Sequence, residues 1–174
     1  MRIISGTHKG RRLNFPSTLP VRPTTDRAKE ALFNILGNRY DFKGKNVLDL
    51  FSGTGNIAYE FASRGCNNMT AIDNNSNCIN YINSTANKFS FNITTIKSDC
   101  YKYIENCKQQ FNFIFIDPPY NYSQYEKIKS LIFEKNLVKK EGCLIIEHDK
   151  NTRFKNQHVE LRKYGTVHFS IFSF

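Results

Sequence analysis

The residues best suited to chemistry are Asp117, Pro118, Pro119 and Tyr120, which directly follow the apolar run 113–116. Four consecutive β-branched and aromatic residues predict a buried parallel strand. The prolines end this strand because neither has an N–H for the ladder, and each keeps the preceding residue extended. We therefore expect a stiff corner that presents one carboxylate, free backbone carbonyls and one aromatic ring.

Such a corner suits a planar group that carries an NH2. Asp117 and the Pro118 carbonyl can accept the two amino hydrogens, while Tyr120 stacks on the ring. The lone pair of the nitrogen would then point at an electrophile. The alternative is a rigid strand-to-loop turn with a surface tyrosine. On the chemical interpretation, Asp117, Pro118 and Tyr120 are the catalytic residues.

A glycine loop supplies the second candidate site. The predicted strand 46–50 is followed by Phe-Ser-Gly-Thr-Gly at 51–55 and by a predicted helix at 56–64. This order is typical of dinucleotide-binding units, but the third glycine of the phosphate fingerprint is missing. Asp49 at the strand end would repel a pyrophosphate and suit a cationic amino group. We therefore favour a nucleoside that carries an amino acid over NAD, and S-adenosylmethionine fits through its amino group and its sulfonium.

Two further acids follow predicted strands. Asp73 comes after strand 69–72 and 24 residues after Asp49, close to the spacing at which an acid binds ribose hydroxyls. Asp99 follows strand 93–96 and can accept from an adenine amino group. Either acid could instead cap a helix. Ligands in open α/β sheets bind along the carboxyl edge of the strands, where Asp49, Asp73, Asp99 and Asp117 are all expected.

The remaining pattern supplies the elements that position these acids. After Thr24-Thr25-Asp26, an apolar stripe at 28, 31, 32, 35 and 36 predicts an amphipathic helix that ends at Gly37, with Lys29 off the stripe. Helices are also expected through 79–86 and 128–132. A fifth strand at 143–146 leads to His148, which is a general base or, as we favour, a loop or substrate-facing residue. Segments 159–163 and 167–172 predict a terminal hairpin.

Composition narrows the class of partner. The 174 residues suggest one domain, and the net charge of +10 favours a polyanion, nucleic acid more than membrane, over a merely soluble basic surface. The five scattered cysteines indicate neither disulfides nor a metal site, which favours reduced thiols in a cytosolic protein. No stretch approaches the roughly 20 apolar residues of a membrane span, and no signal peptide is recognisable.

Cations concentrate in residues 1–27, where a short hairpin around 6–10 is expected. This segment looks like a basic extension on the core and not a core element. Its positive charge favours contact with nucleic-acid phosphates, although a solvated charged arm is the alternative. The predicted RNA-contacting residues are Arg2, Lys9, Arg11, Arg12, Arg22 and Arg27.

Together, Asp49-Leu-Phe-Ser-Gly-Thr-Gly and Asp117-Pro-Pro-Tyr resemble the class I, amino-directed S-adenosylmethionine methyltransferases. Residues 21–36, Val-Arg-Pro-Thr-Thr-Asp-Arg-Ala-Lys-Glu-Ala-Leu-Phe-Asn-Ile-Leu, are more specific. With Ser5-Gly6 and Lys9-Gly10-Arg11 before them, they resemble the bacterial 16S rRNA guanine(966)-N2 methyltransferase family. The resemblance covers essentially the whole chain.

The resemblance implies a Rossmann-like α/β fold with a mostly parallel seven-stranded sheet, helices on both faces and an antiparallel strand in the last hairpin. It divides the chain into a basic extension at 1–24 and a methyltransferase domain at 25–174. It implies methyl transfer from S-adenosylmethionine to N2 of a guanine in 16S rRNA, within the small subunit or its assembly intermediate. A cytoplasmic monomer is expected. The cofactor-binding residues are then Asp49, Phe51, Gly53, Gly55, Asp73, Asn74, Asp99 and Cys100.

Two other functions remain open. A DNA adenine-N6 methyltransferase uses the same Asp-Pro-Pro-Tyr corner, but it would need a target-recognition region for which this chain has no room beyond its N-terminal arm. A non-catalytic RNA-binding assembly protein would keep only a vestigial pocket, and the four acids argue against it.

Overall fold

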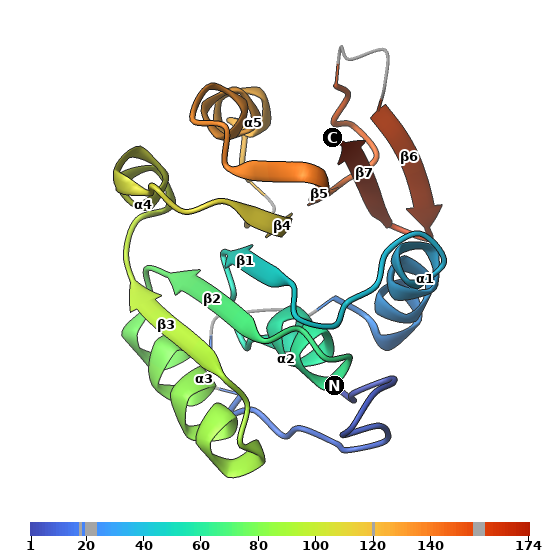
Figure 1. Ribbon diagram of the computed structural model, residues 1–174, viewed down its shortest axis with the longest axis vertical. Coiled ribbons are helices and arrows are strands. Elements are labelled where there is room, and N and C mark those ends of the chain that lie inside the picture. The colour runs from blue at the N-terminus through green and yellow to red at the C-terminus, as the bar shows by residue number, and fades with distance from the viewer. Residues whose placement is uncertain (18, 20–23, 120, 155–158) are drawn as a thin grey trace.

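Seven strands form the centre of the computed structural model, which describes residues 1–17, 19, 24–119, 121–154 and 159–174. They are β1 (Asn46–Leu50), β2 (Asn68–Asp73), β3 (Ile93–Lys97), β4 (Phe111–Ile116), β5 (Val138–His148), β6 (Val159–Tyr164) and β7 (Val167–Ser173). Their order in the sheet is β3-β2-β1-β4-β5-β7-β6 (Figure 1). Neighbours among β1 to β5 pair in parallel, whereas β7 is antiparallel to both β5 and β6. The expected class I methyltransferase fold is confirmed.

Helices cover both faces of this sheet (Figure 1). They are α1 (Asp26–Gly37), α2 (Asn56–Ser63), α3 (Ser76–Phe89), α4 (Cys100–Asn106) and α5 (Tyr125–Glu134). The first three pack on one face, and α4 and α5 pack on the other. Within the described ranges, none of these helices is long and apolar enough to cross a membrane.

Strand β4 is buried between the two helical layers. Phe113 and Phe115 pack into the core formed with α1 and α2, whereas Ile114 and Ile116 pack into the core formed with α4 and α5. A strand covered on both faces needs apolar side chains in both directions, which is why the run is continuous. This rigid centre fixes the position of Asp117 at the strand end.

One helix and the start of one strand differ from the sequence expectation. Helix α4 was expected only in the alternative that Asp99 caps a helix, because its seven residues are too few to show a helical repeat. Strand β5 begins at Val138, earlier than expected, and its pairing with β4 shifts register between Phe111 and Phe113. Glu141 has a left-handed φ of 60° beside this shift, so an irregularity that the sequence pattern does not reveal extends the strand.

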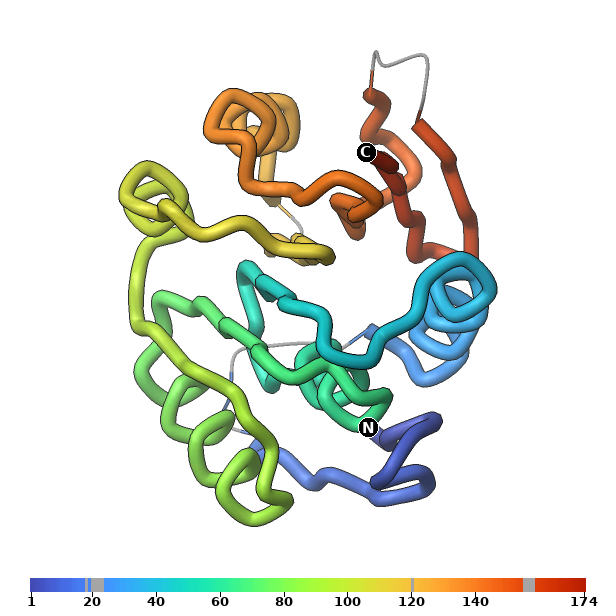
Figure 2. Tube along the Cα trace, in the orientation of Figure 1, coloured from blue at the N-terminus to red at the C-terminus, as the bar shows by residue number. Residues whose placement is uncertain are grey.

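The N-terminal hairpin is present, with an antiparallel bridge between Arg2 and Arg12. Its trace runs beside α2 and α3 (Figure 2). Ile3 and Leu13 are buried in a cluster with residues of α2, β2 and α3, so the expectation that the segment lies outside the core is wrong for its apolar side chains. Gly6 has a φ of +85°, and a Cβ there would lie 1.8 Å from the Ser63 carbonyl oxygen. The hairpin is thus docked closely against the end of α2.

Candidate active site

The chain reverses direction across the sheet between β1 and β4, which are neighbours although β2 and β3 separate them in sequence. Their register pairs Leu50 with Ile116, so the glycine loop and Asp117 leave the same edge side by side. A cavity of about 590 Å³ opens there. Such switch points are where open α/β sheets bind ligands.

Most predicted site residues line this cavity. They are Asp49, Phe51, Gly53, Asp73, Asn74, Asp99, Cys100, Asp117 and Pro118. Gly55 is not among the lining residues, and Tyr120 lies outside the described residues. The structure therefore brings together, at one edge, acids that are spread over the sequence.

Three alternate residues of the glycine loop have left-handed backbone conformations. The φ angles are 61° at Phe51, 53° at Gly53 and 76° at Gly55. A Cβ on Gly55 would approach the Tyr59 ring to 2.8 Å, so glycine is required for this turn into α2. Phe51 has no such freedom, and its conformation is a strained one held at the cavity wall.

Asp73 and Asp99 accept hydrogen bonds from different parts of the backbone. The Asp73 Oδ2 accepts from the Gly53 N–H at 2.8 Å and its Oδ1 accepts from the Asn75 N–H at 2.8 Å. Asn75 caps α3, so Asp73 is not the cap and instead ties the glycine loop to β2. Asp99 Oδ1 accepts from two N–H groups of α4, at 2.9 and 3.1 Å, and is its cap. Their contacts with ribose and adenine stay predictions.

Asp49 carries a buried carboxylate oxygen without a partner. The residue is 2% exposed, and its Oδ2 has no hydrogen bond among the described residues. Burial, and then the charge of Asp73, raises the pKa of Asp49 to about 8. A buried carboxylate oxygen without a hydrogen-bond partner costs free energy unless a ligand supplies a donor. A cationic donor would recover more of this free energy than a neutral one.

A further carboxylate, Glu147, stands beside Asp117. Ile116 pairs with Ile146, so the two acids follow adjacent positions on β4 and β5. Burial, Glu147 and Asp49 together raise the pKa of Asp117 well above its usual range. Burial raises the pKa of Glu147 to about 7, although the Thr24 hydroxyl donates to its Oε2 at 2.7 Å.

Sequence reasoning missed Glu147 and Thr24, both of which line the cavity. The rule that selected the other acids, a carboxylate at the carboxyl end of a predicted parallel strand, applies equally to Glu147. Thr24 offered no such signal, because it is 123 residues away from its partner in the chain.

His148 is not placed to act as a general base. It lies on β5 and is 5% exposed, with Nδ1 2.7 Å from the Asp149 carbonyl and Nε2 2.8 Å from the Ser170 hydroxyl. A carbonyl only accepts, so we assign the proton to Nδ1, and Nε2 then accepts from Ser170. Burial lowers its pKa, which favours the neutral ring. Because His148 lies within β5, the expectation of a loop residue is wrong, whereas the alternative of a substrate-facing residue stays a prediction for a side chain that lines the cavity.

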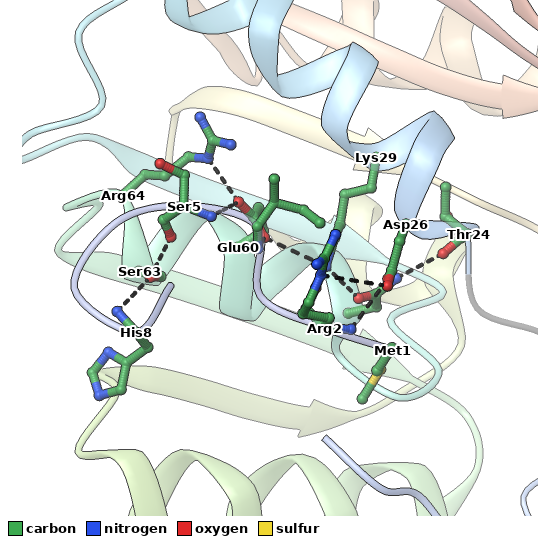
Figure 3. Close-up of polar contacts among 12 residues, drawn as sticks. Met1, Arg2, Ser5, His8, Thr24, Asp26, Lys29, Glu60, Ser63 and Arg64 are labelled. Carbon is green, nitrogen blue, oxygen red and sulfur yellow. Dashed lines mark hydrogen bonds and ion pairs between the residues drawn. The ribbon is translucent and has the colours of Figure 1, made fainter. Parts of the chain in front are cut away.

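A buried polar cluster lies where the hairpin, α1 and α2 meet (Figure 3). Lys29 is 1% exposed, so the expectation that it lies off the packed face of α1 is wrong. Its Nζ donates to the Arg2 carbonyl at 2.8 Å and to Asn56 Oδ1 at 2.7 Å, and lies 3.4 Å from Glu60 Oε2. Burial lowers the pKa of Lys29 and the charge of Glu60 opposes this, so the ion pair is what keeps the ammonium inside the fold.

Glu60 completes the cluster, which connects the hairpin to the cavity. Its carboxylate accepts from the Ile4 N–H at 2.8 Å, the Ser5 N–H at 3.1 Å and Arg64 Nε at 2.8 Å. On the other side, Asn56 Nδ2 donates to the Thr24 carbonyl at 3.0 Å. One set of hydrogen bonds therefore fixes both the hairpin and the residue that contacts Glu147.

The predicted RNA-contacting cations are exposed wherever they are described. These are Arg2, Lys9, Arg11, Arg12 and Arg27, whereas Arg22 lies outside the described residues. Arg2 has an acidic neighbour, Asp26, but its Nε is 3.9 Å from that carboxylate, and an exposed pair of this kind is worth little. The contact with RNA stays a prediction.

Known proteins resemble the chain over most of its length. YlbH of Bacillus subtilis is 32% identical over 155 residues, which cover 86% of this chain and 83% of that protein. "Ribosomal RNA small subunit methyltransferase D" of Haemophilus influenzae is 30% identical over 164 residues, covering 87% and 80%. The solved structure of yhhF from Escherichia coli superposes with a TM-score of 0.85 at 25% identity, covering 99% and 97% of the two chains.

A family model matches residues 1–173, from the docked hairpin to the end of the last strand. The fold, the strand-end cavity and these similarities agree, and the chain belongs to the family described as conserved hypothetical protein 95.

Proposed function

We propose that this protein transfers a methyl group from S-adenosylmethionine to the exocyclic N2 of a guanine in the 16S rRNA of the small ribosomal subunit. The observation that carries the proposal is the position of Asp117, at the switch point of the sheet and in the same cavity as the unpartnered Asp49. The name of the Haemophilus influenzae relative supports rRNA of the small subunit as the substrate.

The cavity residues fit the cofactor. S-adenosylmethionine supplies an electrophilic methyl group on a sulfonium, and it carries an amino group as a second cation. The orphaned Asp49 oxygen suits the amino group, and the neighbouring carboxylates favour positive charge in the cavity. In this proposal Asp73 accepts from ribose hydroxyls and Asp99 accepts from the adenine amino group. The remaining cofactor contacts are Phe51, Gly53, Asn74 and Cys100.

Asp117 and the Pro118 carbonyl hold the target amino group. By accepting its hydrogens they direct the nitrogen lone pair toward the methyl group, which supplies proximity and orientation. Burial and neighbouring acids raise the pKa of Asp117, and the cationic sulfonium favours its ionised form, which then also stabilises the positive charge that develops on the nitrogen. The methylated nitrogen is acidic and can release its proton to water, so no dedicated base is needed. The guanine must leave its stack to enter.

The N-terminal segment, residues 1–24, serves as the RNA-contacting part, and residues 25–174 form the methyltransferase domain. Exposed arginine and lysine bind phosphates without reading sequence, so the choice of one guanine comes from shape. An exposed loop base in folded RNA, together with ribosomal proteins, provides that shape. The enzyme then acts in the cytoplasm as a monomer on the small subunit or its assembly intermediate.

Radiolabelled methyl transfer to small subunits, naked 16S rRNA and duplex DNA in parallel tests the proposal, with the modified nucleoside identified by mass. We expect strong labelling of subunits as N2-methylguanosine and poor labelling of naked RNA and DNA. Preferential labelling of DNA adenine would favour the adenine-N6 enzyme instead. RNA binding without cofactor binding in calorimetry would favour the non-catalytic assembly protein.

A further inference from the structure

Glu147 has no role in the transfer described above, yet it is the cavity acid nearest in register to Asp117. The pairing of Ile116 with Ile146 places the two acids at the ends of neighbouring parallel strands, which lie about 4.8 Å apart. Both carboxylates line the cavity. A base whose amino group reaches Asp117 therefore presents its adjoining edge to Glu147.

The Thr24 hydroxyl fixes how Glu147 faces that base. It donates to Oε2 of Glu147 at 2.7 Å, and Thr24 itself is 5% exposed and held through its carbonyl by Asn56. A hydroxyl has one proton, so Thr24 cannot satisfy both oxygens of Glu147 or the neighbouring Asp117 as well. Among the described residues, no donor reaches Oε1 of Glu147, which leaves an oriented acceptor at the cavity wall.

The two candidate bases differ at the position next to the amino group. In guanine the N2 amino group lies between N1–H, a donor, and N3, an acceptor, and only the N1–H side suits a carboxylate. In adenine the ring nitrogen beside the N6 amino group is a bare N1, an acceptor. A flipped base is read through hydrogen bonds along this edge. A carboxylate satisfies N1–H but faces the bare N1 with like polarity, so the neighbour of Asp117 decides between the two bases.

We propose that Glu147 is the specificity-determining residue for guanine, accepting its N1–H while Asp117 accepts from the N2 amino group. The inference rests on the proposed function of Asp117. The Thr24 hydroxyl supports it by stabilising the ionised form of Glu147, because its donated hydrogen bond offsets part of the rise from burial and leaves the pKa at about 7.

Two base analogues isolate the N1–H contact. The guanine mapped in the transfer experiment is replaced, by ligation of 16S rRNA fragments, with 2-aminopurine or 2,6-diaminopurine, and small subunits are reconstituted. Both analogues keep the 2-amino group and have a bare N1, and they differ from each other at C6. Both also lack the guanine O6, so a defect common to both is assigned to N1–H only where Glu147→Gln relieves it.

The wild-type enzyme should prefer guanine over each analogue by roughly 10- to 100-fold in kcat/KM, as expected for one hydrogen bond to a charged group. Glu147→Gln should reduce the preference to within about threefold, since an amide can either donate to N1 or accept from N1–H. Glu105→Gln, a change at an exposed acid on α4, should keep the wild-type preference. Cofactor affinity, measured by calorimetry, should be unchanged in both variants.

Thr24→Val gives a second route if Glu147→Gln does not fold. Losing the hydroxyl removes the donor to Oε2 and should lower the preference for guanine without altering cofactor affinity. A wild-type preference in either folded variant, or no preference in the wild-type enzyme, would overturn the role of Glu147. If the wild-type enzyme makes no N2-methylguanosine at all, the proposed function fails first, so the two failures are distinguishable.

Discussion

The strand-end cavity and the N-terminal hairpin hold their charges in opposite settings. The cavity gathers Asp49, which is fully buried, with Asp117 and Glu147, which are half-buried. Burial raises the pKa of each acid, and neighbouring carboxylates add to the rise at Asp49 and Asp117. The hairpin leaves Lys9, Arg11 and Arg12 exposed, where solvent screens them. Buried acids are suited to direct a small cation or amino group, whereas exposed cations attract a large polyanion.

The two regions nevertheless share a support. The buried pair of Lys29 and Glu60 holds the hairpin backbone on one side and, through Asn56 and Thr24, reaches the cavity on the other. Each of the following changes alters one region or the support between them, and the expected effects of the first four decrease in size.

The largest effect is expected at Asp117. Asp117→Ala should lower methyl transfer by about 10²- to 10³-fold, because it removes the acceptor that orients and stabilises the attacking amino group. Cofactor affinity should remain nearly as in the wild type. Single-turnover kinetics and calorimetry measure the two quantities. A collapse of cofactor affinity with an intact single-turnover rate would show that the assigned role is wrong.

The support between the regions is broken by Lys29→Met. Removing one partner of a buried ion pair leaves Glu60 incompletely paired, and we expect the free energy of unfolding to fall by about 3 kcal/mol. Denaturant unfolding measures this, with Lys108→Met as the matched exposed control. Equal stability of the two variants would mean that the cluster does not hold the fold together.

On the cofactor side, Asp73→Ala should raise the dissociation constant of S-adenosylmethionine roughly tenfold to a hundredfold, the worth of hydrogen bonds to a charged acceptor. Part of this loss comes from the glycine loop, because Asp73 also accepts from the Gly53 N–H. Calorimetry gives the constant directly. An unchanged dissociation constant would mean that Asp73 only holds the glycine loop and does not contact the cofactor.

On the RNA side, the double change Arg11→Ala and Arg12→Ala should weaken subunit binding about tenfold at low salt and flatten the salt dependence by roughly 1.5 in log–log slope. The modified nucleotide should stay the same, because phosphate contacts carry no sequence information. Filter binding at several salt concentrations, with nucleoside mapping, measures both. A changed target nucleotide would contradict the assignment of these arginines to phosphate contacts. The double change Lys108→Ala and Lys140→Ala, at two exposed lysines, serves as the control.

The last effect concerns pH and is gradual, because it is spread over the range between about pH 4 and about pH 8. Asp49 has a pKa of about 8 in the fold, above the value of roughly 4 expected in the unfolded chain. The folded state therefore binds this proton more tightly, so its contribution to stability is complete below about pH 4 and is lost as the pH rises through about 8. The melting temperature of the cofactor-free protein should fall over this range, and Asp49→Asn should flatten the fall. A melting temperature that rises toward pH 8 would contradict the expected direction of the pH dependence.

The strand-end acids were predictable because parallel strands end at a common edge, so a local pattern in sequence fixes a shared place in space. The same rule would have selected Glu147. The capping role of Asp99 was left open beside its cofactor role, and the structure shows the cap directly.

Lys29 and Thr24 were not predictable on the same basis. A lysine beside an apolar stripe ordinarily faces water, and it is buried here only because Glu60 of another helix and the hairpin backbone surround its ammonium. The contact of Thr24 with Glu147 joins segments 123 residues apart. Polar contacts of this kind form only when distant segments pack together, so the local sequence pattern does not predict them.

Phe51 has a consequence for how this fold responds to mutation. A non-glycine residue at a φ of 61° costs about 1–3 kcal/mol, which a glycine at the same position would recover. The aromatic ring meanwhile forms part of the cavity wall and packs edge-on against Tyr122, with ring centroids 5.5 Å apart. Glycine at this position should therefore bring little thermal endurance, because the relief of the backbone is offset by the lost packing of the ring against Tyr122 and the core beside it.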